Sequence, residues 1–205
     1  MRLLTLFRLP FAIAVLAALG AAVGGAWVTA VLAVIAGAVI FVLGRDPERN
    51  VPSHPLGIVS PVDGCVSAVA REEDPFLERD ALALEIRQGP IAPAILCSPT
   101  EGRIVQIFAG PEIPGHADGE RLAIHLRTDE GDNVVFAVSR PFGLRGPLRW
   151  QVQPGERVGQ GQRRGLAGWG RRIRVYLPPE TSPVVQEGDT VEAGATLVCQ
   201  LIHGG

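Results

Sequence analysis

Lysine is absent from this chain. Its 205 residues include 19 basic residues, and all of them are arginine. Pyridoxal Schiff bases, biotin or lipoyl attachment and the phosphate-binding loop each need a lysine amine, so the sequence excludes all three. The 21 acidic residues give a formal net charge of −2. This balance argues against nucleic-acid binding, which needs a broad cationic surface.

Metal-ligand patterns are also missing. The three cysteines are Cys65, Cys97 and Cys199. They form no C-x-x-C pair, so we interpret them as small buried hydrophobic residues rather than zinc ligands or disulfides. His116 and Asp118, followed at a distance by His125, do not match a recognised ligand spacing either. We therefore expect no metal site.

Charge is missing from residues 9–44, which are 36 consecutive positions between Arg8 and Arg45. One helix of that length would extend about 54 Å, whereas the hydrocarbon core of a membrane is ~30 Å thick. The glycine-rich segment 20–25 predicts a turn. We expect a transmembrane hairpin of two short helices over residues 1–44 and one domain over residues 45–205. A cleaved signal peptide is the alternative, although its apolar region spans only about 7 to 15 residues.

The flanks of this segment predict its orientation. Arg2 and Arg8 precede the uncharged run, and Arg45 and Arg49 follow it. The positive-inside rule places both flanks on the cytoplasmic side. We therefore expect the domain to face the cytoplasm at the cell membrane.

The remainder of the chain has the pattern of a β protein. Short segments rich in branched and aromatic residues, bounded by glycine and proline, predict strands at residues 64–69, 103–108, 134–138 and 172–177. Only residues 74–84 show a weak helical periodicity. The fold class predicted from the sequence is mainly β.

The domain contains an internal repeat. Residues 60–66 (SPVDGCV) resemble residues 98–104 (SPTEGRI), and residues 152–161 (VQPGERVGQG) resemble residues 185–194 (VQEGDTVEAG). The V-x-x-G-x-x-V-x-x-G spacing is typical of the half-barrels of biotinyl and lipoyl domains. A swinging-arm carrier is excluded because there is no lysine to modify.

Taken in order, the motifs of this chain resemble the short bacterial and archaeal type of phosphatidylserine decarboxylase proenzyme. The matching segments are the hydrophobic hairpin, RDPER at 45–49, SPVDG at 60–64, GER at 119–121, GQGQRRGL at 159–166 and VYLP at 175–178. The resemblance implies a half-barrel domain of this family's type. It also implies self-cleavage at a serine, which leaves a pyruvoyl group that accepts electrons during decarboxylation.

The residues that the family uses for self-cleavage are mostly replaced. By this resemblance, Arg171 stands at the position of the nucleophilic serine, Ala94 at that of the activating histidine, and Asp63 at that of the orienting aspartate. A guanidinium cannot be the nucleophile. Residues 151–180 contain no Ser, Thr or Cys, so a shifted alignment does not supply one. Asp63 alone is retained, and a turn-forming role before Gly64 is its simpler interpretation.

We therefore expect a membrane-anchored member of this family that is catalytically inactive, forms no pyruvoyl cofactor, and binds a membrane phospholipid or a partner. The alternative is an active decarboxylase that makes phosphatidylethanolamine with the missing groups supplied by another subunit. A homo-oligomer, or assembly with an active homologue, is a further possibility for its partners.

An arginine cluster is the candidate for lipid contact. Its members are Arg163, Arg164, Arg171, Arg172 and Arg174, with Trp169 between them. Each charge near an anionic surface contributes ~1 kcal/mol to binding. A solvated face of salt bridges is the alternative, because residues 45–205 hold 17 arginines and 21 acidic residues.

Overall fold

The computed structural model describes residues 5–43, 49–52, 54–89, 92–109, 122–139, 148–168 and 170–202. The chain divides into two compact units, Met1–Glu48 and Arg49–Gly205. The boundary predicted at residue 45 lies outside the described residues. Each unit is considered by itself below.

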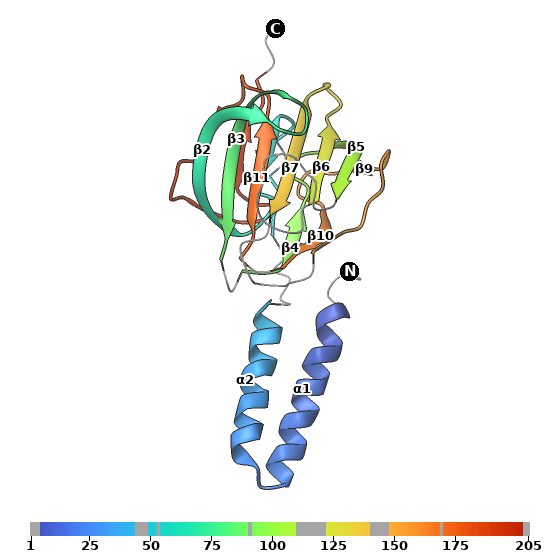
Figure 1. The fold of residues 1–205 in the computed structure, drawn as a ribbon, viewed down its shortest axis with the longest axis vertical. Helices are drawn as coiled ribbons and strands as arrows, with labels where there is room; N and C mark the ends of the chain where they lie inside the picture. Colours follow the sequence, from blue (N-terminus) through green and yellow to red (C-terminus); the bar gives the residue numbers. More distant parts are fainter. Residues whose placement is uncertain are drawn as a thin grey trace. The chain divides into compact units, whose positions relative to one another are not determined.

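The first unit is a helical hairpin. Helix α1 (Thr5–Val23) is followed by helix α2 (Trp27–Leu43), and the chain reverses between them (Figure 1). The reversal falls at Gly24 and Gly25, inside the segment where the sequence predicts a turn. Gly25 has a φ of 76°, a left-handed conformation that glycine adopts without steric cost.

The helices of this hairpin pack together but leave many apolar side chains exposed. The rings of Phe11 and Phe41 lie 5.9 Å apart, and Gly37 allows a close approach to Ala14. Within the described part of the chain, neither helix combines the length and apolar composition needed to cross a bilayer. The predicted transmembrane hairpin is thus observed as a helical hairpin, and its membrane-spanning character is not confirmed.

The second unit consists of β-strands in the described residues. The strands are β1 (Gly57–Val59), β2 (Gly64–Asp74), β3 (Arg79–Gln88), β4 (Ile95–Cys97), β5 (Gly102–Ala109), β6 (Leu122–Arg127), β7 (Asn133–Ser139), β8 (Leu148–Trp150), β9 (Arg157–Val158), β10 (Arg163–Ala167), β11 (Arg172–Leu177), β12 (Ser182–Pro183), β13 (Thr190–Val191) and β14 (Leu197–Gln200). They form an eight-stranded sheet in the order β13-β2-β3-β11-β7-β6-β5-β9, and two three-stranded sheets, β1-β14-β12 and β4-β10-β8. The mainly β fold with a half-barrel sheet is confirmed.

Strand β11 lies at the centre of the large sheet, paired antiparallel with both β3 and β7. Its side chains alternate between the two faces. Ile173, Val175 and Leu177 point into the main core, whereas Arg172 and Arg174 belong to the opposite face.

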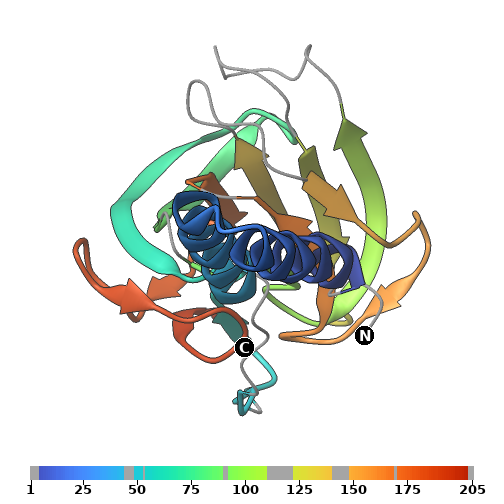
Figure 2. The same ribbon diagram turned by 90° about the horizontal axis from the view of Figure 1, so that it is seen from below.

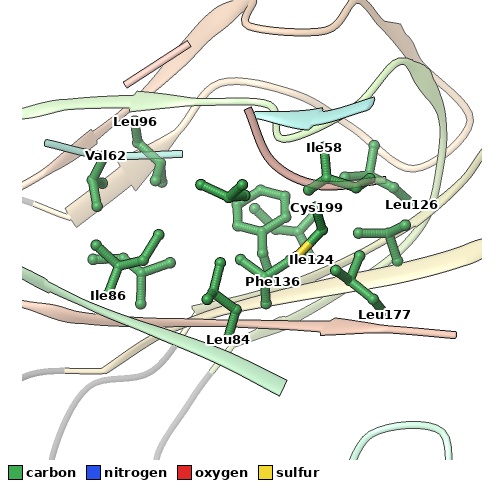
Figure 3. Close-up of a cluster of buried hydrophobic side chains, with 14 of the residues drawn as sticks. Ile58, Val62, Leu84, Ile86, Leu96, Ile124, Leu126, Phe136, Leu177 and Cys199 are labelled. Carbon is green, nitrogen blue, oxygen red and sulfur yellow. The ribbon is translucent and has the colours of Figure 1, made fainter. Parts of the chain in front are cut away.

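The main core lies between the large sheet and the two small sheets. Side chains of the large sheet, such as Leu84, Ile86 and Phe136, face Ile58 of β1 and Leu96 of β4 (Figure 3). All five are fully buried. The view from below shows how strongly the large sheet curves (Figure 2). The curvature lets the small sheets close one side of it, as the half-barrel prediction requires.

All four predicted strands are present, as β2, β5, β7 and β11, but the weak helical prediction for residues 74–84 is wrong. These residues form the end of β2, a tight turn and the first half of β3. Asp74 fixes the turn, because its carboxylate accepts the Phe76 N–H at 2.9 Å and its carbonyl accepts the Glu78 N–H at 2.8 Å. Leu82 and Leu84 then alternate with small residues at the period of a strand.

The internal repeat is visible in the hydrogen bonds. The matching pairs are Ser60 Oγ to Val62 O (2.6 Å) with Ser98 Oγ to Thr100 O (2.7 Å), and Val59 N–H to Pro99 O with Cys97 N–H to Pro61 O (both 2.8 Å). Each serine closes its own Ser-Pro turn, and each turn bonds to the strand that enters the other. The two repeats are therefore joined by reciprocal backbone hydrogen bonds.

Glycine ends each of these turns for a packing reason. A Cβ at Gly64 would lie 2.3 Å from the carbonyl oxygen of Arg87, and a Cβ at Gly102 would lie 2.4 Å from that of Arg127. No side chain fits so close to a neighbouring backbone. The acid-glycine pair of each repeat is thus required by the close approach of the next strand.

Candidate functional site

Asp63 lies in the turn between β1 and β2 and is held by several partners. One of its carboxylate oxygens accepts the Ala193 N–H at 2.7 Å, and the other accepts Arg49 Nη2 at 2.7 Å. Arg49 Nη1 also donates to the first oxygen, so the ion pair is bidentate. The hydrogen bond to Asp63 raises the pKa of Arg49 above its ordinary value, against the opposing effect of burial. The aspartate therefore has more than a turn-forming role.

Arg49 also reaches the segment beside β13. It donates to the carbonyl of Ala193 at 3.2 Å, and its Nε lies 3.7 Å from the carboxylate of Glu192. The two motifs RDPER and SPVDG are thus joined through one guanidinium. Sequence reasoning found both motifs but missed their contact, since nothing in the intervening residues 50–62 indicates that they pair.

Arg171 lies just before β11, and its residue is 1% exposed, which places a long cationic side chain inside the protein. Its carbonyl accepts the N–H of Gln88 at 2.9 Å, at the point where β3 and β11 begin to pair. Interior guanidiniums are rare and are retained where their surroundings satisfy them. The position predicted for the serine is therefore part of the packed interior.

Ala94 is also buried, at 2% exposure, and it lies close to the same backbone. Its carbonyl accepts the N–H of Ala167 at 3.2 Å. The side chain of Gln88 then donates to the carbonyl of Ala167 at 3.3 Å and to that of Pro93 at 3.1 Å. Gln88 therefore links the backbone of Arg171 to that of Pro93, the neighbour of Ala94. Neither Arg171 nor Ala94 carries the hydroxyl or the imidazole of the family's self-cleavage.

A cavity of about 340 Å³ opens beside Asp63. Its walls include Asp63, Cys65, Arg87, Ala92, Thr190 and Glu192. Of the cysteines, Cys65 is exposed while Cys97 and Cys199 are buried, so the prediction of three buried cysteines is wrong for Cys65. Cys65 alternates with the buried Val66 along β2, so its side chain lies on the face of the sheet opposite the main core.

The predicted lipid-contact arginines are distributed over two sheets. Arg163 and Arg164 lie on β10, whereas Arg172 and Arg174 lie on β11. Arg164 forms an ion pair with Glu156 at 3.4 Å. Arg174 forms ion pairs with Glu85 at 3.0 Å and with Glu72 at 3.6 Å. Arg172 is exposed, Arg171 is enclosed, and Trp169 lies outside the described residues.

Of the residues considered as metal ligands, the structure describes His125. His116 and Asp118 lie outside the described residues. His125 is 8% exposed, and its Nε2 forms a hydrogen bond with the Asn133 side chain at 2.9 Å. Asn133 in turn accepts a hydrogen bond from Arg79 through its carbonyl, at 2.6 Å. His125 thus has a structural contact within the sheet.

Comparison with curated proteins identifies the family. The chain is 31% identical over 166 residues to a phosphatidylserine decarboxylase proenzyme from Desulfotalea psychrophila, covering 77% of each chain. It is 33% identical over 171 residues to the proenzyme of the same name from Ralstonia nicotianae, covering 79% of each chain. A third, from Nitrosomonas eutropha, is 31% identical over 181 residues, or 85% of this chain and 83% of the relative. The chain belongs to the phosphatidylserine decarboxylase family.

Membership of the phosphatidylserine decarboxylase family confirms the resemblance of the ordered motifs. A scan of known family models gives no match, and no solved structure matches the chain. The Arg49–Asp63 ion pair and the Arg171–Gln88 contact lie at positions that the resemblance assigns to self-cleavage.

Proposed function

We propose that this protein is a catalytically inactive member of the phosphatidylserine decarboxylase family. The observation that carries this proposal is the burial of Arg171 at the position assigned to the self-cleaving serine. A pyruvoyl group arises only from a residue whose own hydroxyl attacks the backbone and is then eliminated. The residues present do not fit that group, because Arg171 has no hydroxyl and Ala94 has no base.

A neighbouring hydroxyl does not replace the missing one. Ser139 Oγ donates to the carbonyl of Arg172 at 3.2 Å, so it lies beside this turn. Attack by Ser139 on that carbonyl would form an ester between Arg172 and the Ser139 oxygen, break the Arg172–Ile173 peptide bond and release the Ile173 amine. The new N-terminus would be an ordinary amine and not a pyruvoyl carbonyl. This geometry supports an inactive chain even where a serine is close.

We propose further that the helical hairpin holds the protein at the membrane. Large apolar side chains of both helices face outward; Leu16 is 69% exposed and Val28 is 75% exposed. Many exposed apolar side chains on one element indicate contact with another apolar phase, such as a membrane. The arginines that flank the hairpin favour a domain on the cytoplasmic side. Vesicle flotation of the full chain beside a Leu16→Lys/Val28→Lys variant tests the anchor, and retention of flotation by the variant contradicts it.

The second candidate function is phosphatidylserine decarboxylation with groups supplied by another subunit. It is favoured by the names of the relatives and by the retained Asp63. The full chain, purified and denatured, is measured by intact-mass spectrometry and treated with a carbonyl reagent. Inactivity predicts a single uncleaved polypeptide without a reactive carbonyl, and no carbon dioxide released from phosphatidylserine. Two polypeptides whose masses correspond to cleavage near Gly170, or release of carbon dioxide, contradict inactivity.

A further inference from the structure

Two neighbouring arginines lie on the large sheet, and the first of them, Arg87, lines the cavity beside Asp63. Arg87 on β3 and Arg172 on β11 are direct cross-strand partners, and both side chains are exposed. Opposite residues of antiparallel strands have Cβ atoms about 4.5–5.5 Å apart, and like charges at that distance repel. An anion bound between the two guanidiniums would offset this repulsion.

The charges around this pair leave it with a cationic surplus. Glu85 is 3.6 Å from Arg87, but it also pairs with Arg174 at 3.0 Å, so one carboxylate serves two guanidiniums. In the described part of the chain no carboxylate forms an ion pair with Arg172. The acids on the opposite wall, Asp63 and Glu192, are both held by Arg49.

The same row of the sheet extends into the cavity beside Asp63. Cys65 pairs with Arg87 on one side and with Thr190 on the other. All three residues line the 340 Å³ cavity. The row therefore runs Thr190, Cys65, Arg87, Arg172, which places the thiol beside Arg87. Guanidinium forks match the oxygens of a phosphate group.

We propose that Arg87 and Arg172 bind the phosphate group of a ligand that enters this cavity. The inference goes beyond the proposed inactivity and does not depend on it. Phosphate is favoured over a simple carboxylate because it offers more oxygens, enough to accept from two neighbouring guanidinium forks. The phosphate belongs either to a lipid head group or to a soluble phosphate ester.

A second arginine row on the same sheet does not have these features. Arg103 on β5 lies opposite Arg127 on β6 and Arg157 on β9, and all three are exposed. Asp129 bridges to Arg157, and none of these residues lines the cavity. This row supplies a matched control, because replacing two of its arginines changes the net charge by the same amount.

Cys65 supplies a built-in reporter. It is the exposed cysteine of the chain, so alkylation of the full-length protein reports on the site itself. We compare the alkylation rates of Cys65 with iodoacetate, which is anionic, and with iodoacetamide, which is neutral. The ratio of the two rates isolates the local potential, since the state of the thiol affects both reagents alike.

The proposal predicts a lower iodoacetate-to-iodoacetamide ratio, by about threefold or more at low salt, in Arg87→Gln/Arg172→Gln, and an unchanged ratio in the control Arg103→Gln/Arg127→Gln. Inorganic phosphate is expected to slow alkylation of the wild type but not of Arg87→Gln/Arg172→Gln. An equal ratio in all three proteins, or no protection of the wild type by phosphate, overturns the proposal. Added sodium chloride should lower the wild-type ratio, a measurement that needs no variant.

Two further arms identify the source of the phosphate. If glycerol 3-phosphate protects Cys65 of the detergent-solubilised protein, the ligand is a soluble ester. If protection requires nanodiscs containing phosphatidylglycerol and is absent in pure phosphatidylcholine, the ligand is a lipid head group. Intact mass of the same samples separates this test from the proposed inactivity, because cleavage near Gly170 refutes inactivity whatever the alkylation ratio.

Discussion

The burial of Arg171 explains why its replacement does not simply restore an enzyme. The side chain fills interior volume beside β11, and it occurs with Ala94, which offers no base. Buried charged groups are costly to disturb, since a smaller residue leaves both a cavity and an altered polar environment. The arginine at this position therefore both removes the hydroxyl needed for self-cleavage and fills the interior volume.

Arg171→Ser is expected to remain uncleaved and to lose about 2–4 kcal/mol of unfolding free energy, because a buried side chain is removed. Urea denaturation and denaturing intact mass measure the two effects. Its matched control is Arg172→Ser, the exposed neighbour, which we expect to stay within about 0.5 kcal/mol of wild type. A cleaved Arg171→Ser chain would show that the serine alone was missing.

Arg49→Gln is expected to lower the unfolding free energy by about 1–2 kcal/mol, because Asp63 loses the bidentate guanidinium and keeps the hydrogen bond from the Ala193 N–H. Both side chains of the pair are partly shielded, at 15% and 17% exposure, so solvent screens them incompletely. Thermal unfolding beside Arg71→Gln, an exposed arginine on β2, measures the difference. Equal melting temperatures for the two variants would contradict the role given to this pair.

At the scale of elements, the two Ser-Pro turns show how much of the fold the sequence predicts. The repeat, the four long strands and the half-barrel follow from local patterns of branched residues and glycine. The pairing of β11 between β3 and β7 does not, because it joins Arg172 to Arg87, 85 residues earlier, and to Ser139, 33 residues earlier. The helical prediction at residues 74–84 fails for a related reason, since sheet pairing outweighs a weak local periodicity.

Gly64→Ala and Gly102→Ala are each expected to destabilise the protein by about 2–3 kcal/mol, because the added Cβ meets a backbone carbonyl that cannot move. Gly159→Ala serves as the control, since its Cβ would point into open space. Chemical denaturation gives the three values. If Gly64→Ala and Gly159→Ala are equally stable, the close approach of β3 does not constrain the turn.

The ladder of polar side chains across β2, β3 and β11 predicts a pH dependence. Burial alone would raise the pKa of Glu85, but hydrogen bonds from Ser67 and Arg174 outweigh it and hold the pKa below its ordinary value of 4.5. A depressed folded-state pKa gives stability that is present above about pH 4.5 and is lost as the pH falls through the folded-state value.

Glu85→Gln is therefore expected to unfold more easily near neutral pH and to show a shallower loss of stability in acid than the wild type. Urea denaturation as a function of pH measures both. Glu73→Gln, an exposed position on β2, is the comparison and should keep the wild-type slope. A slope unchanged by Glu85→Gln would assign the acid sensitivity to other groups.

At the scale of the whole molecule, the two units have separate cores. The main core and the smaller cluster around Tyr176 draw all their residues from the second unit. The sequence predicts this separation through the abrupt change of composition after residue 44. It does not predict the contact that fixes the start of the second unit, the ion pair of Arg49 with Asp63, because a charged linker gives no sign of its partner.

Deletion of residues 1–48 is expected to leave a folded β unit with its far-ultraviolet circular dichroism signal intact, and to abolish co-sedimentation with membranes. The reason is that no core residue of the unit is removed. Circular dichroism and flotation with phospholipid vesicles check the two parts. Aggregation of the truncated protein would show that the second unit depends on the first for folding. Continued flotation would contradict the proposed role of the hairpin as the membrane anchor.

The central place of β11 has a practical consequence. The turn at Gly170 immediately precedes this strand, which is hydrogen-bonded to β3 on one side and to β7 on the other. Of the later strands, β13 pairs with β2 and β14 pairs with β1. A chain nicked there would stay together as one particle of unchanged size. Gel filtration or a native gel would then report an intact protein, and only a method that first dissolves the sheet can tell a whole polypeptide from a severed one.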